Sequence, residues 1–208
     1  MKRLYLLRHG QTEFNVKKLV QGRCDSPLTD LGRQQAGMAA AWLKAHGVVP
    51  DKVVSSPLGR AMDTAQLVAT ELLGPDAAAE PCEGIIERCY GTFEEGPHDA
   101  LPTDVWDPGE DLVPFGGEGS KALQERMVAT LTNLMGAKGI ETLLAVSHGS
   151  ASRQFIKAVA PGGFEFPTKL PNCAIMIFDF EEEKSGEEGN APQSKFILQQ
   201  IIDPQQSN

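Results

Sequence analysis

Long apolar segments are missing from this 208-residue chain. Its apolar runs, of which Leu4 to Leu7 is typical, are far shorter than the roughly 20 residues that a membrane-spanning helix needs. At the start of the chain, Lys2 and Arg3 are followed by only four apolar residues before Arg8, so no secretory signal peptide is visible. We therefore expect a cytoplasmic protein that has no membrane partner.

Metal-ligand patterns and an excess of basic residues are missing too. No HExxH motif and no paired His/Cys spacing occurs, which disfavours a zinc hydrolase. The formal net charge of -9 argues against a nucleic-acid partner, because binding to a phosphate backbone needs a concentrated basic surface. We expect reduced thiols, no metal and no cofactor. The four cysteines, which share no motif, are Cys24, Cys82, Cys89 and Cys173.

One region, from Gly91 to Ser120, contains no lysine or arginine but has eight acidic residues. It is also the least regular part of the chain, rich in glycine and proline, with Phe93, Trp106 and Phe115 as aromatic anchors. Long insertions of this kind often serve as lids over sites. We predict a lid-like insertion at about 91–120 within a single domain that covers residues 1–208, a length that can bury one proper core.

Strand and helix patterns alternate along the rest of the chain, which predicts an α/β fold. Thr29 is expected to cap a helix whose apolar face includes Leu31, and Ser56 is expected to cap the next helix, with Pro57 at its first position. The acidic run at 181–193 is expected to be a solvated hairpin loop. The expected strands are 4–7, 51–55, 79–82, 143–146, 174–180 and 195–202, and the expected helices are 30–46, 56–73, 120–135 and 150–160.

Two histidines follow apolar strands and precede a glycine. Arg8 and His9 come after the first strand, and His148 comes after a later one. Because the carboxyl ends of parallel strands meet at one edge of a sheet, these side chains should face one crevice. Arg60 would point to the same edge from the first turns of its helix. Arginine offers a planar set of donors to a phosphate, while a neutral imidazole can act as nucleophile, base or metal ligand.

Each of these residues also has an explanation without catalysis. An Arg-His-Gly tripeptide is common by chance, and a histidine at a strand end can be a buried structural residue. Arg60 on a helix surface could pair with Asp63 or Glu71. The combination favours a site, since three further polar segments, SSPLGRAMDTA, ERCYG and VSHG, also fall at the ends of expected elements.

With these segments, and with Asn15 six residues after His9, the chain resembles the histidine phosphatase superfamily. The resemblance is to the branch similar to cofactor-dependent phosphoglycerate mutases, and it runs from Leu6 to about Phe180. It implies a three-layer α/β/α sandwich whose mostly parallel central sheet has an antiparallel edge strand. It also implies that His9 attacks phosphorus and becomes phosphorylated. The residues that would hold the phosphoryl oxygens are Arg8, Arg60, His148 and Asn15.

In the same way, the resemblance implies that Glu87, in ERCYG, donates a proton to the leaving alcohol and later activates water. The alternative is that Glu87 is an exposed partner of Arg88. Secondary substrate contacts are implied for Gly22, Ser26 and Asn172. His46 and His98 have no such context and are expected at a helix end and in a loop. The family pattern Gly-Glu-Ser is replaced here by a segment with an extra glycine, which leaves the role of Glu118 open.

These features predict a metal-independent phosphomonoesterase that acts on a small phosphorylated molecule. A phosphoglycerate mutase is the alternative, favoured by Arg88 and Tyr90, which are typical of mutases in the resembled family. Against it, an acidic lid at 91–120 should repel a second anionic group of the substrate. A catalytically idle binding or regulatory protein is a third alternative, although all the expected reactive residues are present. A homodimer is left open.

Overall fold

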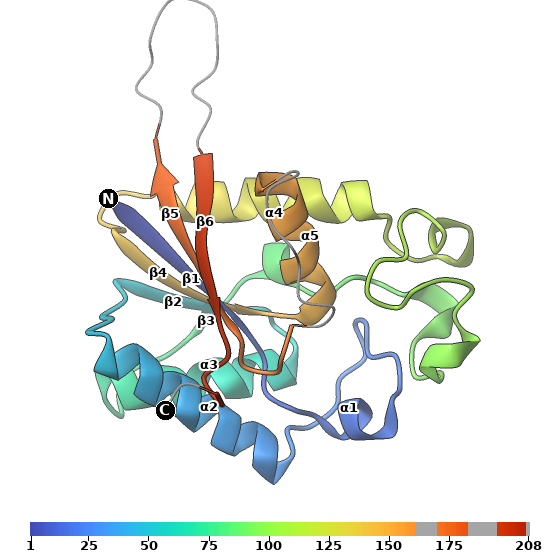
Figure 1. Cartoon of the computed structure of the whole chain (residues 1–208), viewed down its shortest axis with the longest axis horizontal. Helices are drawn as coiled ribbons and strands as arrows, with labels where there is room; N and C mark the ends of the chain where they lie inside the picture. Colours follow the sequence, from blue (N-terminus) through green and yellow to red (C-terminus); the bar gives the residue numbers. More distant parts are fainter. Residues whose placement is uncertain (161–169, 183–194, 207–208) are drawn as a thin grey trace, which may run out of the picture.

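A computed structural model of the chain describes residues 1–160, 170–182 and 195–206. These residues form a six-stranded sheet in the order β3-β2-β4-β1-β5-β6, with helices on both faces (Figure 1). The strands are β1 (Lys2–Arg8), β2 (Lys52–Ser55), β3 (Glu80–Pro81), β4 (Thr142–Ser147), β5 (Ile175–Glu181) and β6 (Lys195–Ile202). The helices are α1 (Glu13–Lys17), α2 (Asp30–Ala45), α3 (Gly59–Leu73), α4 (Ser120–Met135) and α5 (Gly149–Val159).

The sheet confirms the mostly parallel topology with antiparallel pairing at one edge. β3, β2, β4 and β1 run parallel, whereas β5 pairs antiparallel with both β1 and the edge strand β6. The parallel strands end side by side: the His9 amide donates to the Ser147 carbonyl at 3.0 Å, and the Ser56 amide donates to the Val146 carbonyl at 2.9 Å. The residues that follow these strands are therefore brought to one edge of the sheet.

Strand β1 contributes to two cores, because its successive side chains point to opposite faces of the sheet. Leu4 and Leu6 pack in a core with the buried sides of α4 and α5. Tyr5 and Leu7 pack in a second core with α2 and α3. Figure 1 shows these helix pairs on opposite sides of the sheet, which confirms the three-layer α/β/α sandwich.

The predicted start of the helix expected at 56–73 is wrong. α3 begins at Gly59, its N-cap residue Leu58 makes no side-chain capping bond, and Ser56 and Pro57 lie before the helix. The Asp25 carboxylate takes over the capping: it accepts the Gly59 amide at 2.7 Å and the Arg60 amide at 3.3 Å. A carboxylate at a helix N-terminus satisfies free N–H groups and complements the helix dipole, so a residue distant in sequence replaces the expected serine.

Two further expectations concern α2 and the acidic run. Thr29 caps α2 as predicted, because its hydroxyl accepts the Gly32 amide at 3.0 Å. Leu31 was expected on the apolar face, but it is 43% exposed, and the buried face is formed mainly by alanines further along the helix. Most of the expected hairpin loop at 181–193 lies outside the described residues.

The predicted insertion consists of short 3-10 turns rather than long elements. η1 (Glu83–Ile85) precedes it, and η2 (Gly91–Phe93), η3 (His98–Ala100) and η4 (Val113–Phe115) lie within it. It packs on a small core of its own, composed of Val20, Tyr90, Leu101 and Leu112. Within the described ranges, no helix has the length and apolar character needed to cross a bilayer.

Candidate active site

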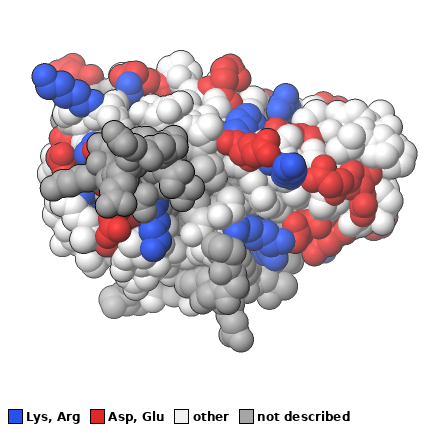
Figure 2. Space-filling view, turned by 90° about the horizontal axis from the view of Figure 1, so that it is seen from above, with Lys and Arg blue, Asp and Glu red and all other residues white. Residues whose placement is uncertain are grey.

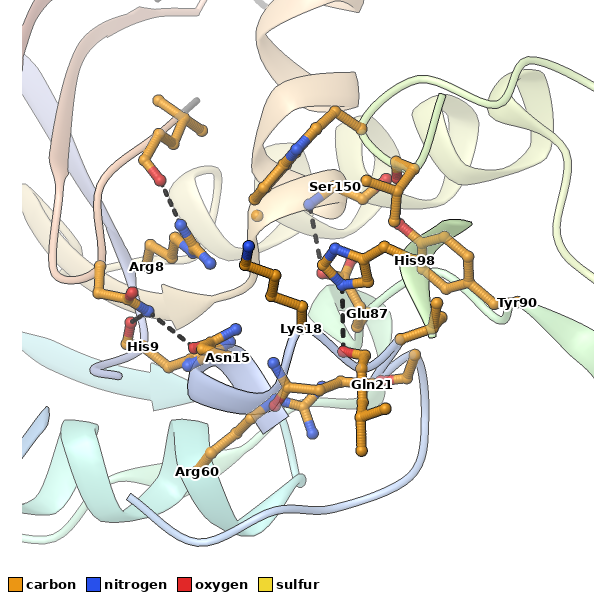
Figure 3. A pocket seen from close by; sticks show the side chains of 18 of the residues that line it. Arg8, His9, Asn15, Lys18, Gln21, Arg60, Glu87, Tyr90, His98 and Ser150 are labelled. Atoms are coloured by element: carbon orange, nitrogen blue, oxygen red, sulfur yellow. Dashed lines mark hydrogen bonds between the residues drawn. The ribbon is translucent and has the colours of Figure 1, made fainter. Parts of the chain in front are cut away.

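A cavity of about 470 Å³ lies at the sheet edge where the parallel strands end (Figure 3). Segments far apart in sequence form its wall: the ends of β1 and α1, the first turn of α3, the start of α5 and part of the insertion. Its volume is within the range of about 300–1,000 Å³ that is usual for small-ligand sites. The predicted site residues that line it are Arg8, His9, Asn15, Gly22, Arg60, Glu87 and Asn172.

His9 is buried at the cavity wall, and its ring orientation is defined by one hydrogen bond. Nδ1 lies 2.7 Å from the Gly10 carbonyl oxygen, and because a carbonyl can only accept, Nδ1 must be the protonated nitrogen. Burial, together with the nearby charges of Arg60 and Arg8, holds the pKa of His9 well below its ordinary value. At neutral pH the imidazole is therefore uncharged, and its Nε2 lone pair is free to attack.

Gly10 allows the turn that follows His9. A side chain at this position would overlap the backbone carbonyl of Gly32 at the start of α2. The close approach also orders the turn, because the Gly10 amide donates to the Thr64 hydroxyl of α3 at 3.1 Å. The first turns of α2 and α3 are thus packed directly against the strand end that carries His9.

Arg8 and Arg60 place two buried guanidinium groups at the cavity. Arg60 donates to the Cys24 and Gly22 carbonyls, each at 2.7 Å, and Arg8 donates to the Leu170 carbonyl. Burial lowers the pKa of Arg8 to about 10 and also lowers the pKa of Arg60, so both remain charged at neutral pH. The Nε atoms of both are buried and have no hydrogen-bond partner among the described residues. These donors suit a phosphate group.

His148 lies behind His9 rather than in the cavity wall. The two rings meet edge to face, with centroids 5.1 Å apart, and His148 is fully buried. Its Nε2 lies 2.7 Å from the Ser56 hydroxyl, while its Nδ1 has no partner in the part of the chain that is described. Burial and then the positive charge of Arg60 hold the pKa of His148 well below its ordinary value. Ser56 therefore orients this histidine instead of capping a helix.

Glu87 is buried beside the N-terminus of α5, which excludes the alternative of an exposed partner for Arg88. Its Oε1 accepts the Arg88 and Ala151 amides, both at 2.8 Å, and its Oε2 accepts the Ser150 amide at 3.2 Å (Figure 3). A helix N-terminus is a natural position for a carboxylate. Because Oε2 has the single and longer bond, it is the oxygen better able to exchange a proton with a bound molecule.

The predicted secondary contacts divide into two groups. Asn172 donates to the His9 carbonyl at 3.1 Å and to Asn15 Oδ1 at 3.2 Å, so the two asparagines are linked at the cavity wall. Asn15 Oδ1 also accepts the Thr12 amide, which leaves its Nδ2 for a ligand. Ser26 was expected to contact the substrate, but its buried hydroxyl accepts the Phe14 amide at 3.0 Å and does not line the cavity. It supports α1 instead.

Two cavity residues, Lys18 and His98, had no role in the sequence analysis. His98 was expected to be an ordinary loop histidine, whereas it lines the cavity together with Lys18, and both are labelled in Figure 3. His46, in contrast, is the C-cap of α2, as predicted. Neither Lys18 nor His98 follows a strand or belongs to a motif, so only the contact between distant loops could reveal them.

Arg88 has no free donor face toward the cavity. It is fully buried, and its guanidinium donates to the Ser150 and Ser120 hydroxyls and to the Glu118 and Gly109 carbonyls, at 2.7–3.3 Å. The carboxylate of Glu118 binds Arg126 through two bonds of 2.8 and 3.0 Å. These residues join the insertion to α4 and α5, which gives Glu118 a structural role.

The acidic residues of the insertion do not line the cavity, although they were predicted to repel a second anionic group of the substrate. Glu94 accepts the Tyr90 and Arg23 amides, and Asp107 pairs with Lys157. Figure 2 shows acidic groups on the outer surface, at the end of the molecule where the insertion lies. The insertion residues that line the cavity are His98, Val105 and Trp106. None of these is acidic, because the acids are used to hold the loop together or are exposed to water.

Residues 4–188 match the family model of the histidine phosphatase superfamily (branch 1). The "Probable phosphoglycerate mutase GpmB" of Proteus mirabilis (strain HI4320) is 33% identical over 190 residues, covering 87% of this chain and 86% of that protein. The structure of phosphoserine phosphatase from Entamoeba histolytica, in complex with 3-phosphoglyceric acid, has a TM-score of 0.74 and 29% identity, covering 97% of this chain and 96% of that one. Phosphoglycerate mutase from Bacillus anthracis str. Sterne shares the fold, with a TM-score of 0.72, 22% identity and coverage of 85% and 87%.

Proposed function

Because the chain belongs to the histidine phosphatase superfamily, we propose that it hydrolyses phosphomonoesters through a phosphohistidine formed on His9. The family comprises phosphatases and mutases, and both are named among the similar proteins. The observation that carries the choice of hydrolysis is the burial of Arg88, whose guanidinium is taken up by protein oxygens. Of the two residues that favour a mutase in the sequence, Arg88 is therefore not presented to a substrate, whereas Tyr90 lines the cavity and its hydroxyl donates to the Val105 carbonyl at 2.8 Å.

In the first step, His9 Nε2 attacks phosphorus while the bond from phosphorus to the alcohol oxygen breaks. Arg8 and Arg60 stabilise the charge on the phosphoryl oxygens, the main task of a protein in phosphoryl transfer. The departing oxygen takes a proton from Glu87 Oε2 and leaves as an alcohol. The imidazole needs no prior deprotonation, because its lowered pKa keeps it neutral.

In the second step, a water molecule replaces the alcohol. The Glu87 carboxylate accepts a proton from this water, whose oxygen attacks phosphorus while the bond to Nε2 breaks. Inorganic phosphate leaves, and both His9 and protonated Glu87 are restored for the next cycle. The Ser150 and Ala151 amides hold Glu87 in place in both steps, because they belong to the rigid start of α5.

The direct test is to offer purified protein 3-phosphoglycerate and O-phosphoserine, and to measure released phosphate and phosphoglycerate interconversion in the same samples. We expect phosphate release to exceed interconversion, because the insertion at 91–120 has no lysine or arginine to hold a phosphoglycerate acceptor and the Arg88 guanidinium is bonded to protein oxygens. Rapid formation of 2-phosphoglycerate, stimulated by a bisphosphorylated primer and with little free phosphate, would instead establish a mutase. The name of the Proteus relative makes this the second candidate.

Metal independence is a separate prediction. Two buried guanidinium groups supply the positive charge that a divalent ion would otherwise provide. In the described part of the chain, no group of three or more His, Cys, Asp or Glu side chains could hold a metal ion. Hydrolysis of an aryl phosphate should therefore continue at its full rate in excess chelator. A rate that vanishes with chelator and returns with zinc or magnesium would disprove this part of the proposal.

A further inference from the structure

We propose that Lys18, with His98 beside it, forms a second subsite that binds a carboxylate carried by the alcohol part of the substrate. The proposal rests on the proposed function and adds a substrate class to it: phosphomonoesters of small hydroxy acids. The two residues come from different loops, one at the end of α1 and one in the insertion, and both line the active-site cavity.

Lys18 is held in an unusual position. It is the C-cap of α1 and has φ 55° and ψ 42°, in the left-handed region that residues with a side chain rarely adopt. Its amide is bonded to the Asn15 and Phe14 carbonyls, and its own carbonyl accepts the His98 amide at 3.2 Å. Contacts on both sides therefore maintain the strained backbone. Figure 3 shows the side chain extending into the cavity.

The charge of Lys18 has no counterpart among the described residues. Within the described ranges, no carboxylate lies within ion-pair distance of its ammonium group. Glu87 is the acidic side chain among the described cavity residues, and its oxygens are already bonded to backbone amides. Arg8 and Arg60 match the charge of a phosphoryl group, so the ammonium of Lys18 remains to be matched by a second negative group on the ligand.

His98 gives this subsite a rigid wall. Its Nε2 lies 3.1 Å from the Leu19 carbonyl oxygen, so Nε2 carries the hydrogen and donates it within the protein, and the carboxylate is bound by the Lys18 ammonium alone. The surrounding loops are joined by backbone bonds: the Val20 amide donates to the Gly96 carbonyl and the Glu95 amide to the Val20 carbonyl, both at 2.8 Å. Lys18 and His98 are therefore fixed relative to each other, while the flexible lysine stem can adapt to the position of a carboxylate.

The cavity size favours a carboxylate on a small alcohol. About 470 Å³ is toward the low end of the usual range for ligand pockets, and part of it must hold the phosphoryl group. Lys18 is exposed, whereas Arg8 and Arg60 are buried, so the second charge lies toward solvent from the phosphoryl site. A compact acid that carries its phosphate and carboxylate a few bonds apart would extend from the phosphoryl site at Arg8 and Arg60 to the ammonium group of Lys18.

The test compares two substrates with the same three-carbon frame, 3-phosphoglycerate and glycerol 3-phosphate, of which only the first has a carboxylate. In Lys18→Asn, kcat/KM for phosphate release from 3-phosphoglycerate should fall about tenfold, as expected for loss of one charge-assisted hydrogen bond. The value for glycerol 3-phosphate should change less than about twofold, since asparagine tolerates the left-handed backbone and the phosphoryl site is intact. Lys18→Arg should retain most of the preference.

Lys17→Asn is the matched control. Lys17 is the exposed neighbouring lysine, lies near Glu13 at 3.8 Å and does not line the cavity, so its loss should leave both substrates unchanged. Equal losses for the two substrates in Lys18→Asn, no loss for either, or the same loss in Lys17→Asn would each overturn the subsite. Failure of the hydrolase proposal is a different result, in which the unmodified protein releases no phosphate from any substrate.

Discussion

Replacement of His9 by alanine should abolish turnover of every phosphomonoester while the fold is retained. The imidazole is the group that forms the bond to phosphorus, and loss of a catalytic nucleophile lowers kcat by about 10⁴-fold or more. Its ring lies at the cavity wall and packs on His148, not in either of the two hydrophobic cores, so its removal should cost little stability. Phosphate release and thermal unfolding, measured on the same samples, separate the two effects.

The same experiment identifies the intermediate. Brief mixing with a labelled phosphomonoester followed by alkaline denaturation should leave acid-labile, base-stable label on His9 of the unmodified protein. His9→Asn is a useful second variant, because its amide can still donate to the Gly10 carbonyl and keep the local turn. His46→Ala, at the exposed end of α2, should be fully active and labelled. Label on a serine or an aspartate, or a His9 variant with near-normal rates, would exclude the mechanism.

The parts of this site that could be predicted from the sequence are those fixed by short-range patterns. Arg8, His9 and His148 directly follow apolar strands, and the rule that parallel strands end at one edge places them together. The strand and helix positions follow from the same local periodicity. Periodicity could not distinguish a residue that lines the cavity from one that is buried behind it. His148 repeats the pattern of His9 but lies behind it, because Ser56 binds its Nε2.

Contacts between distant segments account for the errors. The start of α3 depends on Asp25, 34 residues before Gly59, and no local pattern at Ser56 reveals that partner. Arg88 is similar: the sequence places it beside Glu87, but only the packing of the insertion against α4 and α5 buries it. Counting acidic residues in the insertion predicted repulsion of an anion, yet their bonds within the loop direct them away from the cavity.

Replacement of Glu87 should have the second large effect on the rate of phosphate release, and the size of this effect should depend on the substrate. Glu87→Gln removes the proton donor for the leaving alcohol, a contribution of about 10²- to 10⁴-fold in enzymes that use general acids. Alkyl phosphates, whose alkoxides leave poorly, should lose this full factor. Aryl phosphates leave without a proton, so their first step should be nearly unchanged. Glu118→Gln is the control, because this carboxylate lies outside the cavity and binds Arg126. Its loss should lower stability and change the rates for alkyl and aryl phosphates by the same factor.

In the second step, hydrolysis of the phosphohistidine, Glu87 must also accept a proton from the attacking water. In Glu87→Gln, an aryl phosphate should release a burst of phenol equal to the enzyme concentration, and phosphate release should then be slow while phosphohistidine accumulates on His9. The glutamine amide also faces the Ser150 N–H where Oε2 accepted a bond, so some loss of stability at the start of α5 is expected and is measured by thermal unfolding. A plot of log(kcat/KM) against the pKa of the leaving group should be steeper for Glu87→Gln than for the unmodified protein. Parallel lines and no burst would remove Glu87 from the proton transfers and leave it as a support for α5.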